Sequence, residues 1–111
     1  MRAKYGAVPT VIDGIRFASK AEARRYQELK MLEKAGEIKG LELQPKFPLM
    51  VPECGSGFDV RIGHYIADFR YRKGPKGVLV IEDVKGMKTP VYRLKKKMVE
   101  AQYGISITEV A

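Results

Sequence analysis

Two acidic residues and a lysine stand at the ends of two strand-like segments in the second half of the chain. The first segment begins at Asp68, and the second ends with Asp83 and Lys85. A turn at 73–77, rich in lysine, glycine and proline, joins them. Alternate side chains of a strand share a face, so Asp83 and Lys85 point the same way and Glu82 points the opposite way. If the segments pair as a hairpin, Asp68 faces the same site.

This set of side chains suits a magnesium-dependent hydrolytic site. Mg²⁺ takes oxygen ligands, often one or two carboxylates together with substrate phosphate. A lysine beside them can orient water or stabilise the charge that develops on a phosphate. Taken alone, Asp83 and Lys85 could equally well end a solvated hairpin. The elements around them must therefore decide between the two interpretations.

The first third of the chain predicts a hairpin followed by a helix. Residues 1–7 are expected to form a loose basic arm, and the Asp-Gly pair at 13–14, between apolar runs, predicts a hairpin turn. Ser19 and Glu22 have the spacing of a capping box, which predicts a helix over about 20–35. Glu22 would either cap this helix or contribute a third acid to the candidate site.

Strands are predicted through the middle of the chain. The segment 41–51 reads as one long strand, and its two prolines indicate an edge or a bend. Gln44 within it either supports the candidate site or is a polar residue of an edge strand. A short strand is predicted at 58–62, followed by a turn at 63–64. The single histidine, His64, would be a surface residue of this turn, with assistance to proton transfer as the alternative.

A second helix is predicted over about 90–103. Thr89 is its expected N-cap, with proline at the first helical position, and Gly104 ends it. A final strand follows at 105–110. The apolar residues expected to face inward from this helix are Val91, Leu94, Met98 and Ala101.

The chain is strongly basic, with 21 Lys and Arg against 13 Asp and Glu and a net charge of +8. Such an excess on a small domain favours a polyanionic partner, most often nucleic acid. On the first helix Arg24, Arg25 and Lys30 are expected on a solvated outer face, where they could also contact phosphates. The densest basic cluster lies on and just before the second helix, and it is either a solvated face or a track for phosphates. Its members, the candidate DNA-binding residues, are Lys88, Arg93, Lys95, Lys96 and Lys97.

Length and composition indicate one globular domain over residues 1–111. The sequence contains no run of about 18 apolar residues of the kind that spans a membrane. Cys54 is the single cysteine, which favours a reducing, cytoplasmic location. The expected fold is of the α/β class (mixed α+β): a central mixed sheet flanked by helices, in the order αβββαβ, with an N-terminal hairpin.

Four pieces in this order resemble the PD-(D/E)XK nuclease superfamily, and within it a small phage-encoded family related to Holliday junction resolvases. They are Ser19-x-x-Glu22, Gln44-Pro45, Asp68-Phe69 and Glu82-Asp83-Val84-Lys85-Gly86. One departure from the pattern is Ala67, which precedes Asp68 where the motif has proline.

The resemblance implies a restriction-endonuclease-like core and a Mg²⁺-dependent endodeoxyribonuclease. Mg²⁺, for which Mn²⁺ would substitute, is expected on Asp68, Asp83, the Val84 carbonyl and Glu22. Lys85 would activate or orient the attacking water. The expected catalytic residues are therefore Glu22, Asp68, Asp83 and Lys85, and the products would carry a 3′-hydroxyl and a 5′-phosphate.

The resemblance also implies a partner and a setting. We expect branched DNA such as a four-way junction as the substrate, a homodimer as the active species, and a role in phage recombination, replication or packaging in the cytoplasm of a bacterial host. Two alternatives stay open. One is a nuclease acting on flap or duplex DNA, and the other is a DNA-binding recombination accessory protein that does not cut.

Overall fold

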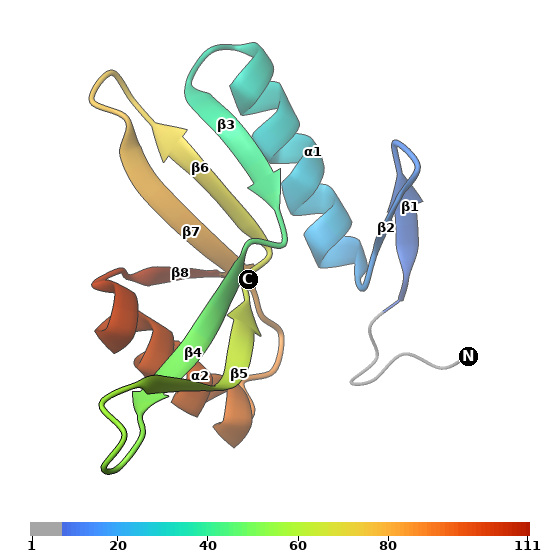
Figure 1. The fold of residues 1–111 in the computed structure, drawn as a ribbon. Helices are drawn as coiled ribbons and strands as arrows, with labels where there is room; N and C mark the ends of the chain where they lie inside the picture. The colour runs from blue at the N-terminus through green and yellow to red at the C-terminus, as the bar shows by residue number, and fades with distance from the viewer. Residues whose placement is uncertain (1–7) are drawn as a thin grey trace.

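The structure, a computed structural model, describes residues 8–111 (Figure 1). The basic arm predicted at 1–7 lies outside the described residues. In chain order the elements are β1 Thr10–Ile12, β2 Ile15–Phe17, α1 Lys20–Lys34, β3 Ile38–Leu43, β4 Lys46–Pro52, β5 Asp59–Ile66, β6 Phe69–Lys73, β7 Val78–Val84, α2 Pro90–Tyr103 and β8 Ile107–Val110.

The centre of the fold is a four-stranded mixed sheet in the order β3-β6-β7-β8. The β3–β6 and β6–β7 pairs are antiparallel, whereas β7 and β8 are parallel. The elements of this sheet and its two helices follow one another as αβββαβ, which confirms the predicted mixed α+β class. The β4–β5 hairpin is inserted between β3 and β6 and forms a separate two-stranded sheet.

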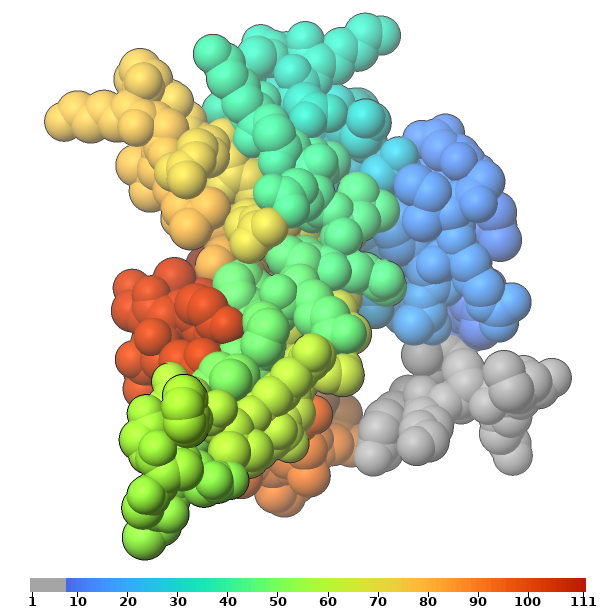
Figure 2. Space-filling view, in the orientation of Figure 1, coloured from blue at the N-terminus to red at the C-terminus, as the bar shows by residue number. Residues whose placement is uncertain are grey.

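Two apolar cores lie on the two faces of the central sheet. The first packs α1 against the sheet through Tyr26, Leu29, Phe69 and neighbouring side chains. The second joins α2, the β4–β5 hairpin and the sheet through residues that include Ile81 and Val99. In Figure 2 the β4–β5 hairpin, in green to yellow-green, forms a lobe at the lower edge of the molecule. The sheet is thus sandwiched between α1 and the α2–hairpin layer.

Local sequence signals account for several element ends. Asp13 and Gly14 have φ angles of 53° and 75°, so both turn residues are left-handed, as tight hairpin turns require. Ser19 accepts a hydrogen bond from the Glu22 amide at 3.1 Å, which confirms the predicted start of α1. Gly104, with φ 65°, ends α2 as predicted.

Two predictions for the middle of the chain are wrong. The segment 41–51 is two strands, because the chain breaks at Gln44, where φ is 53°, and passes from the central sheet to the hairpin. The predicted turn at 63–64 is instead part of β5, which runs unbroken from Asp59 to Ile66 along β4. The long pairing with β4 supplies backbone partners that a local sequence pattern does not reveal.

The inward face of α2 also differs from the prediction. Tyr92 and Val99 are its buried residues, whereas Val91 and Leu94 are 63% and 60% exposed. Ala101 is exposed and Met98 is half-buried. The helix is therefore rotated so that an aromatic residue, rather than the aliphatic stripe, enters the second core.

Within residues 8–111, no helix is both long enough and apolar enough to cross a membrane.

Candidate active site

Asp68 and Asp83 are neighbours across the β6–β7 ladder. Phe69 pairs with Glu82, and the Asp68 amide donates to the Glu82 carbonyl at 3.0 Å. The Val84 amide donates in turn to Asp68 Oδ2 at 2.7 Å. Asp68 thus lies one residue beyond the last pair of the ladder, and one of its carboxylate oxygens is held by the backbone of the strand that carries Asp83. The hairpin geometry expected from the sequence brings these two acids together.

Asp83 is a fully buried acid whose two carboxylate oxygens have no hydrogen-bond partner within the described part of the chain. Lys85 Nζ lies 3.8 Å from Asp83 Oδ1 and 4.6 Å from the centroid of the Tyr92 ring. Burial raises the pKa of Asp83 to about 6, against the opposing effect of the Lys85 charge. A buried carboxylate without donors is costly, so this site calls for a cationic or hydrogen-bonding ligand.

Glu22 lies at the same end of the sheet, in the first turn of α1. Burial raises its pKa to about 7, helped by the negative charge of Asp68 and opposed by the positive charge of Lys85. A smaller contribution from Asp83 acts in the same direction as Asp68. The three acids and Lys85 are therefore close enough to influence one another. Ser19 caps the helix by accepting a hydrogen bond from the Glu22 amide, and a backbone hydrogen bond from Ala18 opposes the rise in the pKa of the Glu22 carboxylate.

Glu82 points to the opposite face of the sheet, as strand alternation predicts. There it accepts hydrogen bonds from Arg25 Nε at 2.8 Å and Arg25 Nη2 at 2.7 Å, and another from the Tyr71 hydroxyl. Arg25 was expected on a solvated face, and that expectation is wrong. The spacing of residues along α1 cannot show that Arg25 lies opposite Glu82, a buried carboxylate on a strand distant in the sequence.

Asp68 and Asp83 offer oxygen ligands that suit a divalent cation, but these two residues do not complete its coordination. Asp83 supplies two buried, unpartnered oxygens, and Asp68 adds a second carboxylate on the adjacent strand. Within residues 8–111, however, no three or more His, Cys, Asp or Glu side chains form a group that could hold an ion as they stand. Mg²⁺ commonly uses only one or two protein carboxylates and fills its other positions with water and substrate phosphate. The residues present are compatible with that kind of site.

Gln44 reaches the site through its backbone. Its backbone amide donates a hydrogen bond to the Asp68 carbonyl at 2.9 Å. Gln44 is exposed and has a left-handed backbone conformation between β3 and β4. The peptide group of Gln44 therefore helps to hold the segment that presents Asp68.

The basic residues of α2 and the preceding loop differ in their surroundings. Lys88 Nζ lies 3.1 Å from Glu109 Oε1, and Lys96 Nζ lies 3.8 Å from Glu100 Oε2. Lys95 is half-buried and lines the same pocket as Lys85. The remaining two candidates, Arg93 and Lys97, are exposed.

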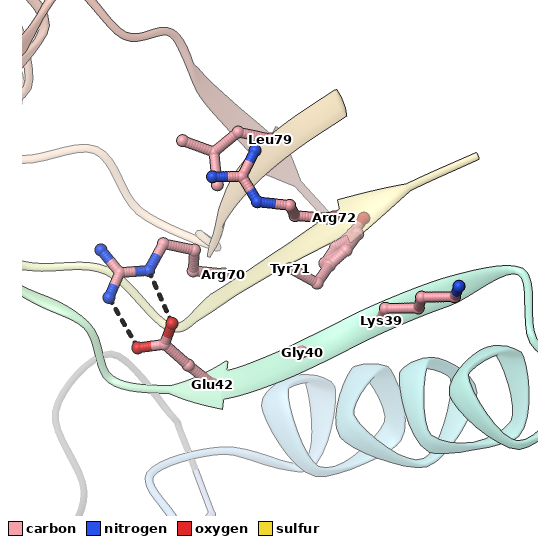
Figure 3. Close-up of a pocket in the computed structure, with 7 residues that line it drawn as sticks. All are labelled: Lys39, Gly40, Glu42, Arg70, Tyr71, Arg72 and Leu79. Carbon is pink, nitrogen blue, oxygen red and sulfur yellow. Dashed lines mark hydrogen bonds and ion pairs between the residues drawn. The ribbon is translucent and has the colours of Figure 1, made fainter. Parts of the chain in front are cut away.

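A hollow of about 350 Å³ lies over β3, β6 and β7 of the central sheet (Figure 3). In it Arg70 and Glu42 form a two-pronged ion pair, with distances of 3.2 and 2.6 Å. None of the candidate catalytic residues lines this hollow, so it is not part of the candidate active site. Its lining residues are Lys39, Gly40, Glu42, Arg70, Tyr71, Arg72 and Leu79.

Tyr92 is a site residue that the sequence analysis missed. Its ring lies beneath the Lys85 ammonium group, and its hydroxyl donates to Glu109 Oε2 at 2.7 Å. Burial raises the pKa of Tyr92, and the hydrogen bond to Glu109 adds to this effect. One sequence feature could have identified Tyr92 as a site residue. It lies in the first turn of the helix that follows the Asp-x-Lys strand.

Comparisons with known proteins give a family and no further relative. No curated protein and no solved structure matches the chain significantly. The family model described as "Protein of unknown function (DUF1064)" matches residues 2–109, which is nearly the whole sequence. The chain therefore belongs to the DUF1064 family.

Proposed function

We propose that this protein is a metal-dependent endonuclease that hydrolyses phosphodiester bonds in DNA. The observation that carries the proposal is the buried, unpartnered Asp83 carboxylate beside Lys85 and across the ladder from Asp68. The proximity of Glu22 and the net charge of +8 support it. Carboxylates, a lysine and a basic surface together match the needs of phosphodiester hydrolysis.

In this proposal Asp68 and Asp83 would hold a Mg²⁺ or Mn²⁺ ion, with help from the Val84 carbonyl and Glu22. Such an ion, when bound, supplies Lewis-acid catalysis at the phosphate. The Val84 amide fixes Asp68 Oδ2, so the orientation of this acid is set before any ligand arrives. Burial of Asp83 excludes competing water from its oxygens.

Lys85 would donate hydrogen bonds to the attacking water or to a phosphate oxygen. The face of the Tyr92 ring lies 4.6 Å from its ammonium nitrogen and restrains it on the side of Asp83. Hydrolysis would then leave a 3′-hydroxyl and a 5′-phosphate, in line with the resemblance described above.

Branched DNA is the proposed substrate, with a four-way junction as the first candidate and flap or duplex DNA as the next. Symmetric cutting of a junction needs two active sites, so the proposed active species is a homodimer. The proposed setting is phage recombination, replication or packaging inside a bacterial cell.

The test uses the full chain with a labelled four-way junction and a linear duplex of matching sequence. Each is incubated with Mg²⁺, with Ca²⁺ and with EDTA, beside Asp83→Ala and the control Asp59→Ala, which removes an exposed acid at the start of β5. We expect paired nicks in the junction with Mg²⁺, lost in Asp83→Ala and retained in Asp59→Ala.

Other outcomes would change the assignment. Mg²⁺-dependent cutting of both substrates would keep the nuclease and remove the junction preference. Tight junction binding with no cleavage under Mg²⁺ or Mn²⁺ would favour a DNA-binding recombination accessory protein. Cutting that survives in Asp83→Ala would exclude this acid from the reaction.

A further inference from the structure

A pocket of about 300 Å³ lies between β5 and the start of α2. It adjoins the candidate active site, because Lys85, which lies 3.8 Å from Asp83, also lines the pocket. Its volume is at the small end of the range for ligand pockets in proteins. The lining residues are His64, Tyr65, Ile66, Lys85, Thr89, Val91, Tyr92 and Lys95.

The charge of the lining favours an anion. Lys85 and Lys95 contribute two positive charges, and no acidic residue is among the lining residues. Thr89 is the N-cap of α2, so the positive end of this 14-residue helix also lies at the pocket. Two ammonium groups and a helix N-terminus are suited to a phosphate group.

His64 and Tyr65 of β5 place two polar side chains at the pocket. His64 is half-buried, and burial together with the charges of Lys46, Arg61 and Lys95 lowers its pKa. Tyr65 is 4% exposed, and its buried hydroxyl has no hydrogen-bond partner within the described residues. Buried polar groups are normally paired, so the unpaired hydroxyl of this lining residue is unusual.

The surroundings single out Lys95 from the basic run on α2. Lys96 is paired with Glu100, and Lys88, before the helix, is paired with Glu109. Lys95 has no ion-pair partner among the described residues and lines the pocket. A ligand in the pocket would therefore meet an uncompensated charge.

We propose that this pocket binds a phosphodiester group of a nucleic-acid strand through Lys95, His64 and the shared Lys85. The bound group would be a neighbour of the scissile phosphate, so the pocket would set the register of the strand on Asp68 and Asp83. The identification of the ligand as nucleic acid rests on the proposed endonuclease function. The anion-binding character rests on the lining alone.

His64 provides a direct reporter, because it is the single histidine of the chain and gives one set of imidazole NMR signals. The experiment titrates the full-length Asp83→Ala protein in EDTA with the thymidine dinucleotide monophosphate, so that neither metal nor cleavage is needed. The same titration is made with Lys95→Ala and with the charge-matched control Lys76→Ala, both in the Asp83→Ala background. Lys76 is exposed in the turn between β6 and β7.

We expect a saturable shift of the His64 signals. Lys95→Ala should weaken dinucleotide binding about tenfold, as expected for loss of one charged hydrogen-bond donor. Lys76→Ala should change it by less than about twofold, because exposed charges act weakly at a distance. Equal weakening by both variants, or His64 signals that do not move, would overturn the proposal.

A second titration with inorganic phosphate distinguishes the source of the ligand. Binding as tight as that of the dinucleotide would mean a free-phosphate site and would overturn the assignment to a nucleic-acid strand. The results also separate the two proposals. Dinucleotide binding in the pocket, without cleavage of DNA by the unmodified protein under Mg²⁺, would reject the nuclease and retain the pocket. Cleavage of DNA without any shift of the His64 signals would retain the nuclease and reject the pocket.

Discussion

Arg25 of α1 and Glu82 of β7 form a two-pronged ion pair, with nitrogen-to-oxygen distances of 2.8 and 2.7 Å. The Tyr71 hydroxyl donates to the same carboxylate. Burial alone would raise the pKa of Glu82, but the hydrogen bonds from Arg25 and Tyr71 hold it below its usual value. Because Glu82 directly precedes Asp83, this cluster fixes α1 against the strand that carries the candidate catalytic acid.

Replacing Arg25 with alanine should destabilise the protein by about 3 kcal/mol, because removal of one partner leaves a buried carboxylate with an unpaired charge. Arg24→Ala is the matched control, since Arg24 is the exposed neighbour on the same helix. It should change stability by less than about 0.5 kcal/mol. Urea unfolding followed by far-ultraviolet circular dichroism measures both. Equal losses would show that the Arg25 charge acts through the general surface field and not through Glu82.

Asp83→Ala should stabilise the protein in EDTA, by about 1–3 kcal/mol, because it removes a buried carboxylate that has no hydrogen-bond donor. The same substitution should abolish any rise of Tm on addition of Mg²⁺, since an ion that binds only the folded state raises stability through mass action. Asp59→Ala, at an exposed acid, should leave both quantities unchanged. Thermal unfolding with EDTA and with Mg²⁺ checks this. A Tm rise that persists without Asp83 would place the ion elsewhere.

The contribution of Glu22 and Asp83 to the pH dependence of stability in EDTA should be opposite in sign to that of carboxylates, such as Glu82, whose pKa is lowered in the folded state. Burial raises the pKa of Glu22 from 4.5 to about 7, and that of Asp83 from 3.8 to about 6. The folded state therefore binds these protons more tightly than the unfolded state. Their contribution to stability is complete below pH 4 or so and is lost as the pH rises through about 6 and 7.

Glu22→Gln isolates the contribution of this residue from the effect of pH on the rest of the basic chain. The stability of the original protein relative to Glu22→Gln, measured by urea unfolding in EDTA, should fall steadily between about pH 5 and pH 8. A difference that stays constant, or that grows with pH, would mean that the Glu22 carboxylate is not held in a buried, negatively charged environment.

The parts of the site that follow from local rules could be predicted from the sequence. Strand alternation put Asp83 and Lys85 on one face and Glu82 on the other, and the turn at 73–77 placed Asp68 across from them. The capping box at Ser19 gave the start of α1. The alternation and the cap depend on residues within a few positions of one another, and the placement of Asp68 depends on a single tight turn between consecutive strands.

Features set by distant packing partners could not be predicted. The β4–β5 hairpin is defined by pairing across the chain, and the Arg25–Glu82 pair joins residues 57 positions apart. On α2 both the stripe with Val91 and Leu94 and the stripe with Tyr92 and Val99 have helical spacing, so periodicity alone cannot show which of them faces the core. Tyr92 enters the core because Tyr65 and the Glu109 carboxylate lie there to receive its ring and hydroxyl.

The rotation of α2 makes Val99, and not Leu94, a core residue. Val99 is fully buried and Leu94 is 60% exposed, although the aliphatic pattern favours Leu94 as a core residue. Val99→Ala should therefore cost about 2 kcal/mol through lost apolar burial and the cavity that remains, whereas Leu94→Ala should cost less than about 0.5 kcal/mol. Urea unfolding at several protein concentrations measures both. A loss at Leu94 that grows with protein concentration would contradict the expectation and would place the exposed stripe of α2 in a contact between two copies of the chain, because only an association responds to concentration in this way.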